Sequence, residues 1–384
     1  MEPDQLRIAL FTGNYNYVRD GANQALNRLV DFLMREGAEV RIYSPTVEKP
    51  AFEAVGEIVS VPAAAIPGRP EYRLPLRIPR KVRRDVEAFA PNVIHVASPD
   101  IVSHRAISWA RRRRIPIVAS VHTRFETYLE YYRMQWLEPT VRAILRRFYR
   151  RCDALVAPAE STAAILRAQR MNGDISIWTR GIYRTQFHPE RRSEAFRTAH
   201  GIAPTDVVVA FLGRLVLEKG LDVFADAVEA ANARGAGLKV LAIGEGPARA
   251  WFAGRLPEAV FTGELTGADL ATALASADVF LNPSVTETFG NVTLEAMACA
   301  LPVVAARASG ATSLVQDGRT GMLADPRAID EFADALCTYA ADPALRSKHG
   351  AAGLAFARTM DWDEINRVVL KVYTRVIERR ARQG

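Results

Sequence analysis

The sequence predicts an α/β protein built from two doubly wound parallel sheets. Short apolar strands alternate with amphipathic helices in the first half of the chain, and the same alternation restarts at Val207. Between the halves lies WTRGIYRTQFHPERR, a stretch punctuated by glycine and proline that suits a linker. We therefore expect a hinge near residues 179–189 and two domains, 1–182 and 183–360.

The elements follow from apolar periodicity and turn residues. In the first half we expect strands at 6–12, 39–43, 58–61, 93–96, 117–122, 154–157 and 175–178, and helices at 21–36, 80–89, 103–113, 136–151 and 161–169. Ser161 is expected to cap the last of these helices, and residues 45–79 are rich in proline and are expected to be irregular. In the second half, strands are expected at 207–212 and around Val240, Val260, Val279 and Val303, and one long helix at 362–382.

The composition is that of an ordinary globular protein. The chain has 384 residues, of which 49% are hydrophobic, and no low-complexity tract. The N-terminus does not read as a signal peptide, and no run approaches the roughly 18 apolar residues of a membrane-spanning helix. The three cysteines, Cys152, Cys299 and Cys337, have neither disulfide nor zinc spacing. We expect buried thiols and a cytoplasmic location.

Positive charge is concentrated in the first half of the chain. Residues 69–84 carry seven cations against one glutamate, 111–114 are four arginines, and 136–151 place arginines beside apolar residues at helical spacing. No nucleic-acid motif accompanies them, so we expect no nucleic acid partner. A basic amphipathic helix favours an anionic membrane surface. The alternative is a helix whose apolar stripe faces its own core.

Two glutamates flank a predicted helix start in the segment PSVTETFGNVTLEAMACALP. Glu287 lies in a turn-forming run, and Glu295 lies about one turn inside a helix that starts near Val292. Between them, Gly290 permits close approach of a ligand to the backbone, and Asn291 precedes the helix. Free N–H groups at a helix start bind anions, and two carboxylates here can hold hydroxyls of an extended, sugar-rich ligand. The alternative is a solvated loop glutamate and a first-turn glutamate that stabilises the helix dipole.

Two cations follow the strand at 207–212. Arg214 and Lys219 lie on the loop after Gly213, and loops at the carboxyl ends of parallel strands are where open α/β sheets bind ligands. A guanidinium fork and a mobile ammonium suit a diphosphate, although ordinary surface charge is the alternative. The next strand ends in Gly244-Glu245-Gly246, which alone indicates only a tight turn.

A histidine and a glycine-containing loop mark the first half. His122 is expected at the carboxyl end of a strand, where a neutral imidazole can donate to a sugar hydroxyl. His95 is also expected to end a strand. The loop at 12–23 contains Gly13 and Gly21, which suit close approach to a phosphate or sugar.

The second half of the chain carries four motifs in order: strand-GR-x4-K, strand-GEG, FTGEL and ETFG-x4-E. Together they resemble the carboxyl-terminal half of a large family of retaining glycosyltransferases, family 4, whose members have the GT-B fold of two Rossmann-like domains. SVHTRFETYLEYY resembles a segment of the subgroup that glycosylates membrane lipids, which includes mannosyltransferases and sulfoquinovosyl transferases. WTRGIYRTQFHP resembles the hinge of that subgroup, with Tyr183 where the subgroup has aspartate.

The resemblance implies two Rossmann-like domains facing across a cleft, with the final helix, residues 361–384, completing the first domain. It implies that Arg214 and Lys219 hold a donor diphosphate, that Glu295 binds ribose and that Glu287 contacts the donor sugar. His122 joins Arg214, Lys219 and Glu287 in the expected catalytic set. The expected donor-binding residues are Gly21, Arg180, Gly244, Gly290, Asn291 and Glu295.

The function implied is retaining transfer of a hexosyl group from a nucleotide sugar to a membrane lipid or lipid-linked acceptor, on the inner face of the cytoplasmic membrane. GDP-mannose is the favoured donor, and UDP-hexoses or UDP-uronic acids are the next choice. No aspartate pair stands in a metal-binding D-x-D context, so we expect neither an essential metal nor another cofactor. The alternatives are a nucleotide-sugar 2-epimerase of the same fold and a non-catalytic sugar-nucleotide-binding module.

Overall fold

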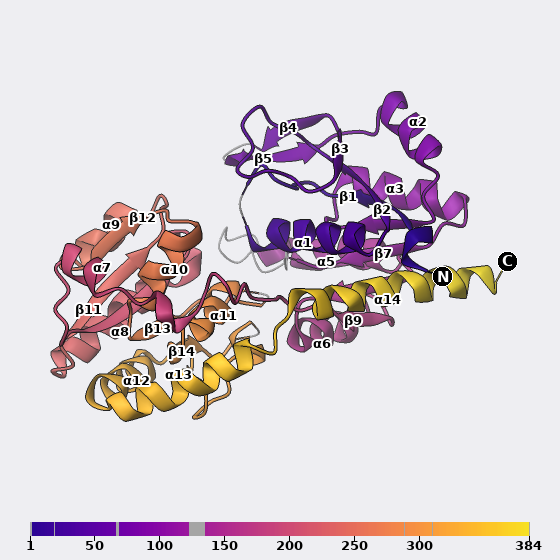
Figure 1. The fold of residues 1–384 in the computed structure, drawn as a ribbon. Coiled ribbons are helices and arrows are strands. Elements are labelled where there is room, and N and C mark those ends of the chain that lie inside the picture. The colour runs from indigo at the N-terminus through magenta and orange to yellow at the C-terminus, as the bar shows by residue number, and fades with distance from the viewer. Residues whose placement is uncertain are drawn as a thin grey trace. The chain divides into compact units, whose positions relative to one another are not determined.

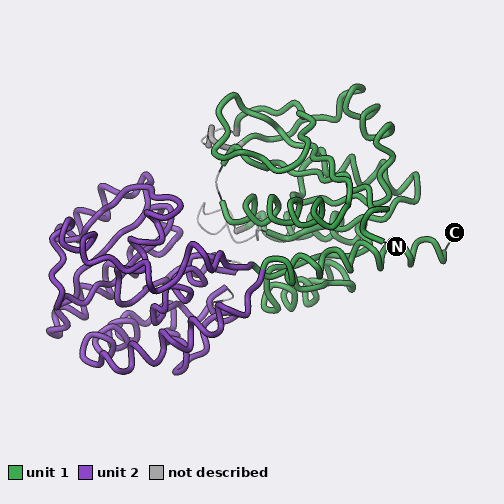
Figure 2. Tube along the Cα trace, viewed as in Figure 1, with its two compact units in different colours: residues 1–180, 362–384 green, residues 181–361 purple. Residues whose placement is uncertain are grey.

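The chain divides into two compact units. The computed structural model describes residues 2–18, 20–66, 69–122, 135–287, 289–308 and 310–383. Unit 1 comprises Met1–Arg180 and Trp362–Gly384, and unit 2 comprises Gly181–Asp361 (Figure 2). The linker was expected near residues 179–189, and the chain passes from unit 1 to unit 2 after Arg180.

Unit 1 contains a parallel sheet of seven strands in the order β3-β2-β1-β6-β7-β8-β9 (Figure 1). Its strands are β1 (Arg7–Phe11), β2 (Glu39–Ser44), β3 (Glu57–Ser60), β6 (Val93–Val96), β7 (Ile117–Ser120), β8 (Ala154–Ala157) and β9 (Ile175–Ile177). Its helices are α1 (Gly21–Arg35), α2 (Arg80–Phe89), α3 (Ile101–Arg112), α5 (Glu138–Tyr149), α6 (Glu160–Ala168) and α14 (Trp362–Ala381). The central strands β6, β7 and β8 are buried along their whole length, as expected for strands covered on both faces.

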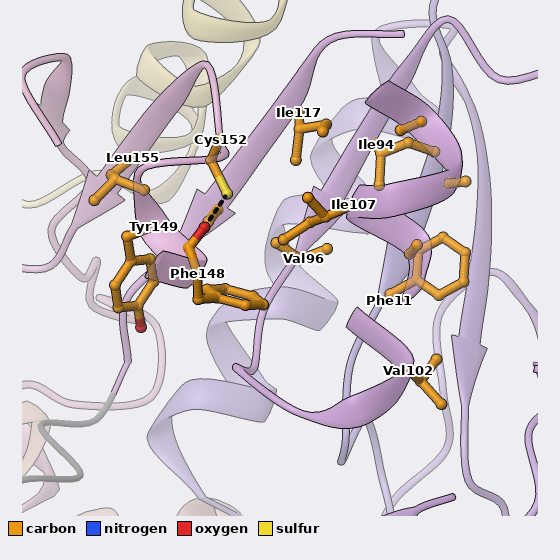
Figure 3. Packing of buried hydrophobic residues seen from close by; sticks show 14 of the residues in the cluster. Phe11, Ile94, Val96, Val102, Ile107, Ile117, Phe148, Tyr149, Cys152 and Leu155 are labelled. Atoms are coloured by element: carbon orange, nitrogen blue, oxygen red, sulfur yellow. Dashed lines mark hydrogen bonds between the residues drawn. The ribbon is translucent and has the colours of Figure 1, made fainter. Parts of the chain in front are cut away.

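Carboxylates fix the starts of two helices in unit 1. Asp20 accepts a hydrogen bond from the Asn23 N–H and begins α1, and Asp100 accepts one from the Ser103 N–H and begins α3. One face of the sheet then closes with α3 and α5 over a continuous apolar core. Figure 3 shows Ile94, Val96 and Ile107 packed in this core, where the Cys152 thiol faces the Phe148 carbonyl oxygen at 3.7 Å.

Unit 2 repeats the architecture with six parallel strands in the order β12-β11-β10-β13-β14-β15. Its strands are β10 (Val207–Leu212), β11 (Leu238–Ile243), β12 (Val260–Gly263), β13 (Val279–Asn282), β14 (Val303–Ala306) and β15 (Gly321–Ala324). Its helices are α7 (Glu194–Ala199), α8 (Leu221–Ala233), α9 (Arg249–Arg255), α10 (Gly267–Ala275), α11 (Asn291–Ala298), α12 (Ile329–Ala341) and α13 (Pro343–Ala357). In both sheets the strand order reverses beside the first strand, between β1 and β6 and between β10 and β13. Such reversals are where open α/β sheets bind ligands.

The last helix, α14, belongs to unit 1. Arg35 of α1 forms an ion pair with Asp363 at 2.7 Å, and the Trp178 indole N–H donates to the buried Asn366 side chain at 3.0 Å. Tyr373 is fully buried in the same helix. No helix of the described ranges is long and apolar enough to cross a membrane.

Two local expectations were wrong, and one strand was not expected. Residues 45–79, expected to be irregular, contain an antiparallel hairpin of β4 (Ala63–Ile66) and β5 (Arg69–Pro75). Ser161 does not cap α6, because the helix starts one residue earlier with Ala159 at its N-cap. The strand β15 was not expected, because its sequence GMLA does not alternate apolar with polar residues. Only two of its four residues, Met322 and Leu323, are large and apolar.

Candidate functional site

Two loops of unit 2 meet at the reversal between β10 and β13. The loop after β10 ends in a short 3-10 helix, Leu217–Lys219, and Gly220, which has a φ of +75°. A Cβ at Gly220 would lie 3.1 Å from the Pro283 carbonyl oxygen, which starts the loop after β13. A glycine is therefore required here for two reasons: the backbone is left-handed, and the neighbouring loop leaves no room for a side chain. This contact fixes Lys219 beside the loop that carries Glu287.

Lys219 and Glu287 form an ion pair in this place. The Lys219 Nζ lies 2.8 Å from Glu287 Oε1, and the side chains are 32% and 12% exposed. Asn282, the last residue of β13, donates from Nδ2 to Glu287 Oε2 at 3.4 Å and to the Thr293 hydroxyl at 2.9 Å. The sequence analysis placed Lys219 and Glu287 in one expected catalytic set, but it did not single out Asn282. A polar residue that ends an otherwise apolar strand is the signal that could have identified it.

Gly290 is required by the local backbone and by the neighbouring Glu287, and its contact with a donor stays a prediction. Its φ is +96°, and a Cβ there would lie 3.0 Å from Glu287 Oε2 and 3.4 Å from the Thr293 hydroxyl oxygen. The Glu287 carboxylate, rather than open space, lies beside the glycine. Asn291 begins α11, and no side chain of the described residues caps this helix start. The N-cap residue Gly290 thus has no side chain to offer the first-turn N–H groups, which is compatible with an anion site.

Glu295 lies inside α11 with little solvent access. Burial, and secondarily the charge of Glu287, raises the pKa of Glu295 to about 8. Its carboxyl group is therefore mainly protonated at neutral pH and can donate as well as accept a hydrogen bond. The same surroundings raise the pKa of the nearby Cys299 thiol to about 12, through burial first and Glu295 second.

Arg214 and Gly244 lie on neighbouring loops of the same sheet edge. Arg214 is exposed directly after β10. A Cβ at Gly244 would lie 2.0 Å from the Gly213 carbonyl oxygen, and the Gly244 N–H donates to the Gly263 carbonyl oxygen at 2.9 Å. Packing of one backbone on another therefore requires this glycine. Its contact with a donor stays a prediction.

Unit 2 thus presents Lys219, Arg214 and Glu287 on neighbouring loops of one sheet edge, and the largely protonated Glu295 in the helix that follows. Cations of these two kinds bind phosphate groups, and the two carboxyl groups differ in their ability to accept and donate hydrogen bonds. The Lys219–Glu287 ion pair also balances charge before any ligand arrives. The arrangement suits a ligand with both phosphate and hydroxyl groups.

Unit 1 places His122 in a line of hydrogen-bonded side chains. His122 Nδ1 lies 3.1 Å from Arg180 Nη2, and His122 Nε2 lies 2.8 Å from the Ser120 hydroxyl oxygen. Ser120 in turn lies 2.8 Å from His95 Nε2, and His95 Nδ1 lies 2.5 Å from the Tyr373 hydroxyl oxygen. Both ring nitrogens of His122 therefore have protein partners. The expected donation from His122 to a sugar hydroxyl would require one of these partners to be exchanged.

His95 lies inside β6 and is fully buried, so the expectation of a histidine at a strand end was wrong. Burial lowers the pKa of His95 to about 3. The pKa of His122 is also lowered well below its usual value, by burial first and then by the positive charge of Arg180. Both imidazoles are consequently neutral at physiological pH.

Arg180 is a buried cation at the end of unit 1. It is 4% exposed, donates to the carbonyl oxygens of Trp178 and Thr179, and lies 4.8 Å from the centre of the Trp178 ring. Burial lowers its pKa to about 10, and the charge of Asp20 opposes that shift. Arg180 therefore stays charged at neutral pH and holds the ring of His122 from one side.

The opening loop is fixed to the body of unit 1. The Gly13 N–H donates to the Ser98 hydroxyl at 2.8 Å, and a Cβ at Gly13 would lie 3.2 Å from the Asp100 carboxylate. Tyr15 and Asn16 of this loop are buried and donate hydrogen bonds to the Val55 and Phe52 carbonyl oxygens. Gly21 is the first residue of α1. The motif residues at 123–134 lie outside the described residues.

The basic helix of the first half mainly faces its own core. Leu145, Phe148 and Tyr149 of α5 are buried, which favours the alternative of an amphipathic helix that covers its own domain. Ile144 is 52% exposed, and Trp136 in the preceding turn is 74% exposed. Leu74 and Leu76 are also exposed, in the segment rich in arginine. Within the described ranges, no group of three or more histidine, cysteine, aspartate or glutamate side chains could hold a metal ion.

Two family models match the chain in succession. The model described as Glycosyltransferase Family 4 matches residues 19–186, and the model described as Glycosyl transferases group 1 matches residues 206–342. Together they span most of both units.

Relatives match over nearly the whole length. A GDP-mannose-dependent alpha-mannosyltransferase of Mycolicibacterium smegmatis is 32% identical over 98% of this chain and 99% of its own. A sulfoquinovosyl transferase of Arabidopsis thaliana is 30% identical over 94% of this chain and 73% of its own. Among solved structures, sucrose-phosphate synthase from Thermosynechococcus elongatus matches with a TM-score of 0.78 at 20% identity, over 97% of this chain and 100% of that one.

Proposed function

This chain belongs to glycosyltransferase family 4 and is a glycosyltransferase of the GT-B fold, and we propose that it transfers mannose from GDP-mannose to a membrane lipid or lipid-linked acceptor. The observation that carries this proposal is the full-length relationship to an enzyme named for GDP-mannose. UDP-hexoses and UDP-uronic acids are the second choice of donor. Neither the epimerase nor the non-catalytic module draws support from these relatives.

The donor site we propose is the sheet edge of unit 2. Arg214 and Lys219 bind the diphosphate, Glu295 binds the ribose, and Glu287 contacts the transferred sugar. The Lys219–Glu287 ion pair supports this assignment, because one arriving ligand offers phosphate oxygens to Lys219 and hydroxyl groups to Glu287. Gly290 is required for the geometry of Glu287, and the start of α11 at Asn291 offers N–H groups to an anion.

The mechanism we propose is front-face displacement with retention of configuration. The bond between the anomeric carbon and the leaving phosphate oxygen breaks, and the acceptor hydroxyl forms the new bond on the same face. The leaving phosphate oxygen accepts the proton of the acceptor hydroxyl. Arg214 and Lys219 stabilise the charge that develops on the diphosphate, a contribution of roughly 3 kcal/mol for one well-placed group in a water-poor site.

The acceptor side of the proposal rests on unit 1. Its arginine-rich segment carries Leu74 and Leu76 at 41% and 45% exposure, and Trp136 adds an exposed aromatic ring. Cations attract anionic headgroups, and exposed apolar side chains insert at the interface. We therefore propose peripheral contact with an anionic membrane on the cytoplasmic side.

We also propose that no divalent metal is needed. The D-x-D spacing of the chain occurs at Asp361 and Asp363, and each faces an arginine: Asp361 lies 3.6 Å from Arg184, and Asp363 lies 2.7 Å from Arg35. Arg214 and Lys219 can supply the positive charge that a metal would give to a diphosphate.

Nucleotide release and sugar transfer test the proposal directly. The purified chain is incubated with GDP-mannose, UDP-glucose or UDP-glucuronic acid, with and without a membrane lipid extract, and lipid products are analysed by mass spectrometry. We expect GDP release that rises steeply with lipid, and a product heavier by one hexose. Release of free nucleotide with an altered free sugar and no lipid product would instead indicate an epimerase.

A further inference from the structure

The line of side chains in unit 1 runs from a partly exposed group to the centre of the fold. His122 keeps some solvent access, whereas Ser120, His95 and Tyr373 are 3%, 0% and 0% exposed. Four hydrogen bonds join Arg180, His122, Ser120, His95 and Tyr373 in that order. His95 lies in β6, Ser120 in β7 and Tyr373 in α14, while His122 lies in the loop after β7 and Arg180 is the last residue before unit 2. A buried polar line of this kind fixes side chains in one arrangement when each member is satisfied.

Arg180 determines where the proton of His122 lies. A guanidinium group has only donors, so His122 Nδ1 must accept and carries no proton. The neutral ring then has its proton on Nε2 and donates it to the Ser120 hydroxyl oxygen. The Ser120 hydroxyl can donate to His95 Nε2, which leaves the proton of His95 on Nδ1, facing the Tyr373 hydroxyl oxygen.

We propose that Ser120, His95 and Tyr373 are positioning residues that hold the His122 ring in a single orientation and in the tautomer protonated on Nε2. This inference rests on the proposed function and on the expectation, implied by the resemblance, that His122 belongs to the catalytic set. It has a chemical consequence for the transfer step. Because the lone pair on Nδ1 is occupied by Arg180, His122 does not act as the base, and the proton of the acceptor hydroxyl goes to the leaving phosphate oxygen.

The chain contains a matched control for a test of Tyr373. Tyr339 in unit 2 is also fully buried, and its hydroxyl oxygen lies 2.7 Å from the Nδ1 atom of buried His349. Tyr373→Phe and Tyr339→Phe therefore each remove the hydroxyl of a helical tyrosine from a buried tyrosine–histidine pair. Their structural cost should be similar, and only Tyr373 connects to His122.

Steady-state kinetics of the full chain compare the two variants. Tyr373→Phe should lower kcat by about threefold to tenfold, the range that one neutral hydrogen bond represents, while the KM for the donor changes by less than about twofold. The groups proposed to bind the diphosphate and the ribose lie in unit 2, so the donor KM should be spared. Tyr339→Phe should leave both constants within about twofold of wild type, with a similar loss of thermal stability. Equal kinetic effects of the two variants would overturn the proposal.

A second measurement is independent of activity. Long-range proton–nitrogen NMR spectra of protein labelled on its six histidines report which ring nitrogen is protonated, and His122→Gln assigns the signal. We expect His122 to be protonated on Nε2 in wild type and in Tyr339→Phe, and to exchange between arrangements in Tyr373→Phe. A proton on His122 Nδ1 in wild type would overturn the proposal. A wild-type protein that transfers no sugar, yet shows the expected tautomer, would contradict the proposed function alone.

Discussion

Glu295 gives the sharpest prediction from the structure. Its pKa, raised to about 8 from an ordinary 4.5, means that the folded protein keeps a proton that the unfolded chain releases. Between these two values the folded state binds more protons than the unfolded state, so the contribution of Glu295 to stability falls as the pH rises from 4.5 to 8. Above pH 8 the destabilising contribution is complete and constant.

The magnitude follows from the two pKa values. Each unit of pKa difference corresponds to about 1.4 kcal/mol, so the full difference would give about 5 kcal/mol. The side chain retains partial solvent access, which reduces the cost, and we expect about 2 kcal/mol. Glu295→Gln has nearly the same shape without an ionisable group. The variant should therefore match wild type near pH 4.5 and exceed its stability by about 2 kcal/mol at pH 9.

Urea unfolding of unit 2, followed at pH values from 5 to 9, measures this difference. Glu258→Gln, at an exposed position of the same unit, is the control and should show no pH-dependent gain. A difference between Glu295→Gln and wild type that stays constant from pH 5 to pH 9 would refute the reasoning. A variant that is less stable than wild type at pH 9 would do so as well.

The remaining predictions concern activity and membranes. Lys219→Ala should lower kcat by about 100-fold or more, because it removes the cation that stabilises the charge on the leaving diphosphate. The circular dichroism spectrum should stay unchanged, and transfer at the wild-type rate would contradict a role of Lys219 in binding the diphosphate. EDTA should leave transfer from GDP-mannose unchanged, and activity that returns only with added Mg²⁺ or Mn²⁺ would show a metal requirement. Trp136→Ser should weaken binding to phosphatidylglycerol vesicles in flotation, whereas Trp251→Ser in unit 2, at a residue 40% exposed, should not.

The fold could be predicted where local sequence decides the structure. The strands at 93–96 and 207–212 and the helix at 80–89 were expected with the bounds that the structure gives, because a short apolar run or a 3.6-residue period is complete within each segment. The hairpin of β4 and β5 was not expected, because its first strand is mainly alanine and its second contains two prolines. Both residue types are depleted in strands, and this pairing depends on tertiary context.

The sequence pointed to the charged residues of the candidate site, but it did not point to the residues that hydrogen-bond to them. Lys219 and Glu287 stand at positions that loops after parallel strands bring together, so their proximity could be expected. The contacts of Asn282 with Glu287 and of Tyr373 with His95 could not, because the spacing within one element does not encode which side chains meet across the fold. Gly244 and Gly290 were recognised as special, but only the structure shows that a carbonyl oxygen and a carboxylate occupy the space beside them.

The return of α14 to unit 1 also orders events during synthesis on the ribosome. Unit 2 is continuous in sequence, so it can fold as soon as Asp361 has emerged, whereas unit 1 must wait for residues that are translated afterwards. Until then Trp178 lacks Asn366 and His95 lacks Tyr373, and the face that α14 will cover stays open. The nascent chain therefore completes its second sheet domain before its first, and α14, which is synthesised after unit 2, completes the hydrogen-bonded line of side chains that includes His122.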